Sequence, residues 1–145
     1  MKSKEVKVPN SAFKAVIFDL NGVLIPSIWP EADTSMIELV KSLKKNNLKT
    51  AILSNLMIGD AMSVKSSDWA QYFDVFALSG EIQSAKPEPA SYLSVLDMLN
   101  CTPEQAVFVD DLPGHVAGAR AVGLKAILFH NELLLRKELN SLGLL

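Results

Sequence analysis

The sequence has little of what several classes of protein need. Its 145 residues include one cysteine, so no disulfide can form within the chain, and one cysteine with two histidines argues against a zinc site. No apolar stretch approaches the roughly 18 residues of a membrane span. Residues 1–11 also lack the apolar region of a signal peptide. We therefore expect a cytoplasmic protein that has no membrane partner.

A surplus of positive charge is also missing. Lys and Arg together number 14 against 16 Asp and Glu, which gives a net charge of −2, so we expect no nucleic-acid partner. Three lysines gather near the N-terminus, where residues 1–12 are expected to form a flexible tail. The chain is 49% hydrophobic, and its length fits one core. We expect a single domain over residues 13–145.

Short apolar runs alternate with segments of helical character. The runs are continuous, as in strands buried on both faces, and they are Ala15–Phe18, Leu48–Leu53, Val75–Leu78, Ala106–Val109 and Ala126–Phe129. Helices are expected from a cap at Asp33 or Thr34 to Asn46, and over residues 56–72, 87–100, 114–122 and 131–142. This alternation predicts an α/β fold, with a mainly parallel sheet covered by helices on both faces.

Polar residues follow three of the predicted strands within one or two positions. They are Asp19, Ser54 and the pair Asp110-Asp111. Because ligands of open parallel sheets bind beyond the carboxyl ends of the strands, we expect these side chains to converge at one edge. Lys86 follows a predicted loop over Ser79–Ala85 and can reach the same edge.

The carboxylates suit metal-assisted nucleophilic chemistry. Asp19 is the candidate nucleophile, because a carboxylate that attacks phosphorus gives an aspartyl phosphate that water can later cleave. Mg²⁺ prefers oxygen ligands, and Asp111 with Asp110 beside it can supply one side of such a site. Taken alone, an Asp-Asp pair after a strand is also a common solvated turn.

The remaining polar residues suit a phosphate group. The Ser54 hydroxyl and the backbone N–H of Asn55 can hold a phosphoryl oxygen, although a Ser-Asn pair alone can simply close a strand. Lys86 can stabilise developing negative charge as a fixed cation.

Taken together, these segments resemble the four motifs of the haloacid dehalogenase-like hydrolase superfamily. The matching stretches are Phe18–Leu24, Ala51–Asn55, Ser84–Pro89 and Asp110-Asp111 with the helix end Gly118–Leu124, and they cover roughly residues 13–129. The resemblance implies a Rossmann-like three-layer fold. It also implies that Asp19 is the nucleophile and a metal ligand, that residue 21 offers its backbone carbonyl to Mg²⁺, and that Asp111 is a main metal ligand. Asp110 would be a nearby or outer partner, and Ser54 and Lys86 would bind phosphate.

Two residues depart from the family pattern. Asn21 stands where the family's phosphatases have an Asp that protonates the leaving alcohol and then activates water. Loss of such a group costs about 10²–10⁴ in rate, but much less for leaving groups that need no proton. Four residues beyond Asp111, where the family often has Asp or Asn, the chain has His115, which fits a residue at a helix N-terminus better than a ligand.

The spacing of the motifs leaves no room for the helical cap domain that many related enzymes insert. Asp19 and Ser54 are only 35 residues apart, and one helix and one strand separate Lys86 from Asp110. Residues 25–30 form at most a small flap, in which Trp29 either covers the site or packs on a helix. An uncapped site is expected to accept a large phosphorylated partner, or to borrow a lid from another subunit.

Two hypotheses of different classes remain open. The first is a Mg²⁺-dependent phosphatase acting on a phosphorylated small molecule or macromolecule. The second is a binding or regulatory module that keeps metal and phosphate binding but not turnover, as Asn21 favours. A dehalogenase fits less well, because it needs no Mg²⁺ and leaves the acidic pair unused. The leucine-rich tail over residues 133–145 can pack on its own sheet or on a second copy, so a homo-oligomer stays open.

Overall fold

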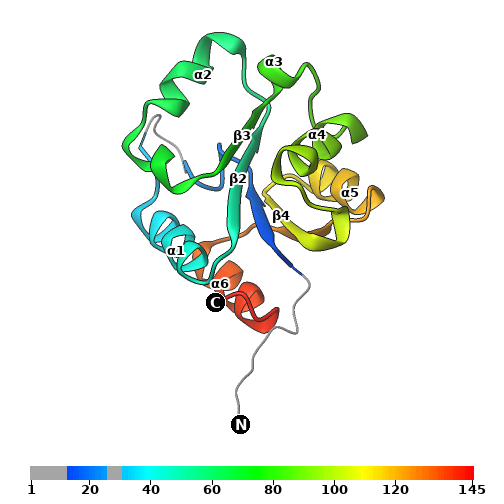
Figure 1. Ribbon diagram of the computed structural model, residues 1–145. Coiled ribbons are helices and arrows are strands. Elements are labelled where there is room, and N and C mark those ends of the chain that lie inside the picture. The colour runs from blue at the N-terminus through cyan, green and yellow to red at the C-terminus, as the bar shows by residue number, and fades with distance from the viewer. Residues whose placement is uncertain (1–12, 26–30) are drawn as a thin grey trace.

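Five parallel strands form one sheet at the centre of the protein. The computed structural model describes residues 13–25 and 31–145. The strands are β1 (Ala15–Phe18), β2 (Lys49–Ser54), β3 (Val75–Leu78), β4 (Ala106–Asp110) and β5 (Lys125–Leu128), in the order β3-β2-β1-β4-β5 (Figure 1). The five strands predicted from the apolar runs are confirmed, with ends shifted by one residue at most.

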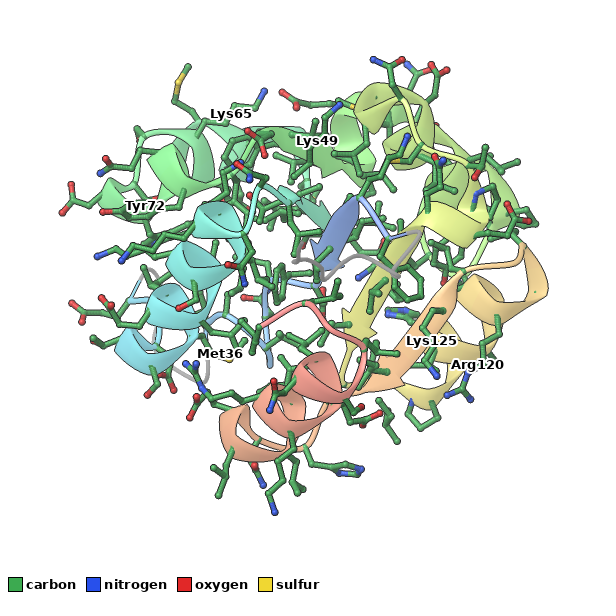
Figure 2. The ribbon with its side chains drawn as sticks, turned by 60° about the horizontal axis from the view of Figure 1, so that its bottom comes forward. Met36, Lys49, Lys65, Tyr72, Arg120 and Lys125 are labelled. Carbon is green, nitrogen blue, oxygen red and sulfur yellow. The ribbon has the colours of Figure 1, made fainter. Side chains whose placement is uncertain are left out.

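Helices cover both faces of this sheet. They are α1 (Thr34–Lys45), α2 (Ile58–Lys65), α3 (Ser79–Ile82), α4 (Pro89–Leu99), α5 (Pro113–Ala121) and α6 (Glu132–Ser141), with 3₁₀ turns η1 (Asp68–Tyr72) and η2 (Pro103–Gln105). Helices α1, α2 and α6 pack on one face, and α4 and α5 pack on the other (Figures 1 and 2). The predicted three-layer α/β architecture is therefore confirmed.

The uniformly apolar strands are explained by burial on both faces. In β1, Val16 and Phe18 point into the core beneath α1, whereas Ala15 and Ile17 point into the core beneath α4 and α5. All four side chains are fully buried. Alternate residues of a strand face opposite sides of the sheet, so a strand covered on both sides needs an apolar residue at every position.

The prediction of a single helix over residues 56–72 is wrong. Helix α2 ends at Lys65, and a separate 3₁₀ turn follows from Asp68. The Ser66 hydroxyl donates to the Met62 carbonyl at 2.8 Å, and the Ser67 hydroxyl donates to the Val64 carbonyl at 2.7 Å. Serine side chains that bond the preceding turn compete with the backbone of a continuing helix, which ends α2 here.

The loop predicted over Ser79–Ala85 contains one short helical element. Helix α3 begins directly after β3 and ends at Ile82, and Gln83 then adopts a left-handed conformation with φ of 59°. The Gln83 N–H donates to the Ser79 carbonyl at 2.9 Å. This tight turn redirects the chain toward Lys86 at the carboxyl edge of the sheet.

The part of the chain that the structure describes holds no inserted cap domain. The described residues between β1 and α1 contain no helix, and only α4 and η2 lie between Lys86 and β4. The predicted flap with Trp29 and the predicted N-terminal tail lie outside the described residues. Among the helices of the described residues, none is both long and apolar enough to cross a bilayer.

The C-terminal leucines divide between core and surface. Leu135, Leu139 and Leu144 are buried in the core beside α1, whereas Leu133 is 63% exposed. Helix α6 therefore packs at least one apolar stripe on its own domain. Figure 2 shows α6 and α1 on the same side of the sheet.

Replacing Leu139 by Ala tests this packing, with Leu133→Ala as the matched control in the same helix. We expect Leu139→Ala to lower the free energy of unfolding by about 2–5 kcal/mol, because it leaves a cavity in the core. Leu133→Ala should change it by less than about 0.5 kcal/mol. Urea unfolding followed by circular dichroism measures both, and equal losses would contradict the burial of the Leu139 stripe.

Candidate functional site

The site forms where three adjacent strands end. Asp19 directly follows β1, Ser54 is the last residue of β2, and Asp110 is the last residue of β4. Strand β1 lies between β2 and β4, so the three residues share one edge of the sheet. The Asp19 N–H donates to the Val109 carbonyl at 2.9 Å, which fixes Asp19 beside the end of β4. The structure thus brings these predicted site residues to one edge.

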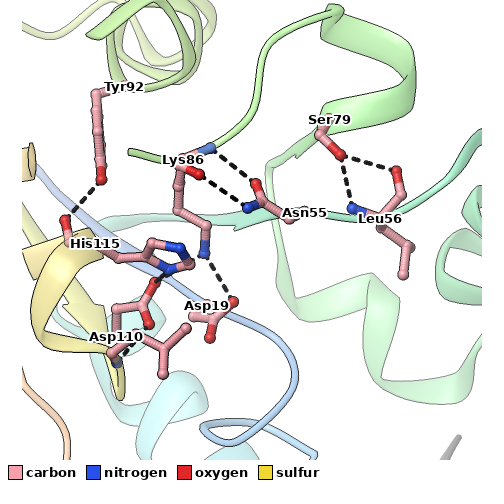
Figure 3. A network of polar contacts seen from close by, with 9 residues as sticks. Asp19, Asn55, Leu56, Ser79, Lys86, Tyr92, Asp110 and His115 are labelled. Carbon is pink, nitrogen blue, oxygen red and sulfur yellow. Dashed lines mark hydrogen bonds and ion pairs between the residues drawn. The ribbon is translucent and has the colours of Figure 1, made fainter. Parts of the chain in front are cut away.

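Lys86 joins the two strand-end carboxylates. Its ammonium Nζ donates to Oδ1 of Asp19 and to Oδ2 of Asp110, each at 2.8 Å (Figure 3). The Lys86 side chain is fully buried, and so is that of Asp110. A buried ammonium requires such partners, because an isolated buried charge is very costly. Lys86 is therefore held as a fixed positive charge against Asp19.

Asn55 fixes the backbone that carries this lysine. Its side-chain Oδ1 accepts from the Lys86 N–H at 2.9 Å, and its Nδ2 donates to the Lys86 carbonyl at 3.1 Å. The amide side chain thus pairs with one residue's backbone as a neighbouring strand would. The sequence predicted only the Asn55 backbone N–H as a functional group, and no local pattern shows which distant residue its side chain meets.

Asp110 has both carboxylate oxygens occupied by hydrogen bonds. Oδ1 accepts from the Leu112 N–H at 3.0 Å, and Oδ2, already bonded to Lys86, lies 3.0 Å from Nδ1 of His115. Burial raises the pKa of Asp110, but the Lys86 charge and these donors outweigh it and hold the pKa below its usual value. Asp110 is therefore a carboxylate that orients Lys86.

His115 lies in the first turn of α5, as expected, and it also contacts the site. The sequence did not indicate its contact with Asp110, because the five-residue separation matters only once the turn before α5 is formed. The backbone carbonyl of His115 accepts from the Tyr92 hydroxyl at 2.6 Å, which ties α4 to this turn. Figure 3 shows the chain of contacts from Tyr92 through His115 and Asp110 to Lys86.

Asp19, Asp110 and Asp111 form an acidic cluster that fits a metal ion. One carboxylate oxygen from each lies within 4.8 Å of the other two. Among the described residues, the Asp111 carboxylate has no hydrogen-bond or ion-pair partner, in contrast to Asp110. One ammonium cannot neutralise three carboxylates, and the three side chains offer the oxygen ligands that hard cations prefer.

Gly22 makes room for this cluster. It adopts a φ of 88°, which favours glycine, and a Cβ built at this position would collide with the Asp111 carboxylate. Its N–H donates to the Ile25 carbonyl at 2.8 Å, which closes the turn after Asp19. The neighbouring Asn21 side chain is exposed. The backbone at Gly22 therefore approaches the Asp111 carboxylate more closely than a residue with a side chain could.

Ser54 presents a hydroxyl that nothing else uses. The residue is 2% exposed, and the described part of the chain offers its side chain no hydrogen-bond partner. An unsatisfied buried polar group costs about 1–3 kcal/mol, so such groups call for an explanation. A ligand oxygen bound beside Asp19 would supply the missing partner.

The charge state of Asp19 reflects this crowding. Burial raises the pKa of Asp19, Lys86 opposes this and the nearby Asp110 charge adds to it, so that the pKa rises from 3.8 to about 7. The ionised carboxylate is therefore unfavourable in the folded protein unless a cation balances it.

The family assignment follows from comparison with known proteins. The haloacid dehalogenase-like hydrolase family matches residues 31–129, which include Ser54, Lys86 and the Asp110-Asp111 pair. The chain belongs to this family. The resemblance seen in the motifs is thereby confirmed, and so is the Rossmann-like fold without a cap in the described residues.

Individual relatives are more distant. The chain is 31% identical over 109 residues to bifunctional epoxide hydrolase 2 of Mus musculus. The aligned region covers 72% of this chain and 20% of that protein. It is 26% identical over 128 residues to a phosphorylated carbohydrates phosphatase of Thermotoga maritima. That aligned region covers 88% of this chain and 59% of the phosphatase. The chain thus spans about a fifth and about three fifths of the lengths of these relatives.

A solved structure supports the fold over nearly the whole chain. An uncharacterized protein from Corynebacterium glutamicum superposes with a TM-score of 0.76 at 27% identity, covering 90% of this chain and 96% of that one. The match covers nearly the full length of both chains, so that protein shares the fold described above.

The raised pKa of Asp19 predicts how pH affects the metal-free protein. Because the folded state binds the Asp19 proton more tightly than the unfolded state, this group's contribution to stability falls as pH rises from about 4 to 7. Asp19→Asn cannot ionise. We therefore expect its unfolding free energy to approach that of the wild type near pH 5, and to exceed it by on the order of 1–3 kcal/mol at pH 8.

Urea unfolding in the presence of a chelator measures this difference. Asp97→Asn, which removes an exposed carboxylate in α4, is the control and should show no comparable gain between the two pH values. If the stability difference between Asp19→Asn and wild type is the same at pH 5 and pH 8, the raised pKa of Asp19 is contradicted.

Proposed function

We propose that the protein is a Mg²⁺-dependent phosphatase that forms an aspartyl phosphate on Asp19. The observation that carries this proposal is the Asp19 carboxylate beside a buried ammonium, an acidic cluster and an unpaired buried hydroxyl. Asp19 supplies a nucleophile, and the other groups suit a phosphate and its counter-ion. The similarity to the phosphatase of Thermotoga maritima supports the same reaction class.

The proposed metal site uses two of the three clustered carboxylates. Asp19, Asp111 and the backbone carbonyl of Asn21 would hold Mg²⁺, because the Asp111 carboxylate is unpaired and the turn at Gly22 approaches it closely. When bound, the ion supplies positive charge that offsets the repulsion among the carboxylates and the phosphate. Asp110, whose oxygens already bind Lys86, Leu112 and His115, would act as an outer partner.

Ser54, Asn55 and Lys86 would bind the phosphate of the substrate. The Ser54 hydroxyl and the Asn55 backbone N–H would donate to phosphoryl oxygens, while Lys86 offsets the negative charge that develops on them. An Asp19 carboxylate oxygen attacks phosphorus, and the bond from phosphorus to the leaving oxygen breaks. Water then cleaves the acyl phosphate, which releases inorganic phosphate and restores the carboxylate.

Asn21 determines which substrates react readily. An amide cannot protonate a leaving alkoxide or take a proton from water at neutral pH. Esters whose oxygen leaves as a stable anion, such as aryl and acyl phosphates, need no proton donor and should be turned over best. The exposed position of Asn21, at the turn after Asp19, leaves its side chain available to orient water by hydrogen bonds.

A second function is favoured by the same residue. Because Asn21 removes the expected acid and base but leaves the metal and phosphate groups in place, the protein would bind both ligands without turnover and act as a binding or regulatory module. Under this alternative the acidic cluster and Lys86 keep their ligands, and only the chemical step is absent.

Hydrolysis of 4-nitrophenyl phosphate distinguishes the two functions. We expect wild-type activity to require Mg²⁺ and to disappear when a chelator is added. In Asp19→Asn it should fall by about 10³-fold or more, because the nucleophile is gone. Asp97→Asn serves as the control and should keep wild-type activity. If the wild type binds Mg²⁺ and tungstate by calorimetry but releases no phosphate, the binding module replaces the enzyme.

Restoring a carboxylate at position 21 tests the role of the amide. We expect Asn21→Asp to raise kcat on an alkyl phosphate such as glycerol 3-phosphate by about 10²–10⁴, since the alkoxide then receives a proton. The gain on 4-nitrophenyl phosphate should be much smaller. Asn21→Ala, which has no carboxylate, should show no gain, and an unchanged rate in Asn21→Asp would mean that another group already transfers the proton.

A further inference from the structure

A cleft opens beside the candidate site at the same edge of the sheet. Its volume is about 550 Å³, within the range of pockets that hold small organic ligands. Leu56 and Met57, which follow β2, contribute to its lining, together with Ser79, Gln83 and Glu88 from the segment between β3 and α4. None of these residues has a role in the site described above.

Two residues that line the cleft are sequence neighbours of the groups that would hold phosphate. Leu56 is next to Asn55, and another lining residue, Ala85, directly precedes Lys86. Consecutive Cα atoms are about 3.8 Å apart, so the lining begins within about 8 Å of the Cα atom of Ser54. A phosphate held by Ser54 and Lys86 can therefore extend its ester group into this cleft.

Hydrogen bonds connect the segments that line the cleft. The Ser79 hydroxyl accepts from the Leu56 N–H at 2.8 Å and donates to the Leu56 carbonyl at 3.1 Å, and the Gly80 N–H donates to the same carbonyl at 2.9 Å. Figure 3 shows this contact next to the pairing of Asn55 with Lys86. These hydrogen bonds join the segment after β2 to the start of α3, close to the residues that would bind phosphate.

One charge dominates the lining. Glu88 is the only ionisable residue among the residues that line the cleft, and within residues 13–25 and 31–145 it forms no ion pair. Its Oε1 accepts from the Ser84 hydroxyl at 3.3 Å and the Ala85 N–H at 3.4 Å. The nearby Lys65 ammonium is paired with Glu81 at 2.8 Å. A ligand in the cleft therefore meets a negative charge with no compensating cation in the lining.

We propose that this cleft binds the alcohol part of the substrate, and that Glu88 selects phosphate monoesters whose alcohol carries an amine. The apolar part of such an alcohol would contact Leu56 and Met57, and its ammonium would approach the Glu88 carboxylate. A carboxylate or a second phosphate in the same place would be repelled. This inference rests on the proposed function, because it requires that the site accepts phosphate esters.

Two matched aryl phosphates test the selection. Tyramine O-phosphate carries an ammonium, and 3-(4-hydroxyphenyl)propionate O-phosphate carries a carboxylate, on similar phenol leaving groups. We expect wild-type kcat/KM to be about fivefold higher for the ammonium ester, the scale of one partly exposed ion pair. Glu88→Gln should bring the ratio close to one, and Glu88→Lys should invert it. Glu104→Gln, which removes a distant exposed carboxylate, should keep the wild-type ratio.

Dissociation constants of both esters, measured by calorimetry with Mg²⁺ present, separate this inference from the proposed function. If phenyl phosphate is hydrolysed but the two esters react and bind equally well, the selection by Glu88 is wrong and the phosphatase stands. If no ester is hydrolysed but the ammonium ester still binds more tightly in a Glu88-dependent way, the phosphatase is wrong and the cleft assignment stands. If neither ester binds and phenyl phosphate is not hydrolysed, both are wrong.

Discussion

The site depends on one buried ammonium placed between two carboxylates. Lys86 contacts Asp19 and Asp110, and its side chain is fully buried. Removing Lys86 would leave Asp19 and Asp110 without their cation, and an uncompensated buried charge typically costs about 3–5 kcal/mol. The surrounding contacts therefore serve to keep Lys86 in place. Asn55 binds its backbone, while the Leu112 N–H and the His115 ring contact the Asp110 carboxylate.

The same arrangement leaves the site short of positive charge. Three carboxylates lie close together, Lys86 contacts only two of them, and the pKa of Asp19 is raised to about 7, mainly by burial. A divalent cation would relieve this repulsion, so its binding would stabilise the fold through mass action. Asp110 and Asp111 differ in their partners. Both oxygens of Asp110 accept from protein donors, whereas the Asp111 carboxylate has no partner among the described residues and would be available to a cation. The incomplete neutralisation of these carboxylates is the physical basis of the proposed cation and phosphate site.

The sequence predicted those features that depend on short-range patterns. Continuous apolar runs such as Ala15–Phe18 identified strands buried on both faces, and the residue after each run identified the edge where Asp19 and Asp110 meet. Features that depend on tertiary contacts were not predictable. The Asn55 side chain meets Lys86 across 31 residues, and His115 reaches Asp110 only after the turn before α5 forms. The end of α2 was missed because Ser66 and Ser67 bond back to the preceding turn.

The most direct test of this account is the position of a bound divalent ion. Mn²⁺ shares the oxygen preference of Mg²⁺ and can be located by anomalous diffraction from crystals of the whole chain grown with MnCl₂. The account predicts one ion at roughly 2.0–2.3 Å from carboxylate oxygens of Asp19 and Asp111, with Lys86 still bound to Asp110. An ion bound elsewhere while this cluster holds none, or a Lys86 ammonium that has left Asp110 to pair with Asp111, would contradict it.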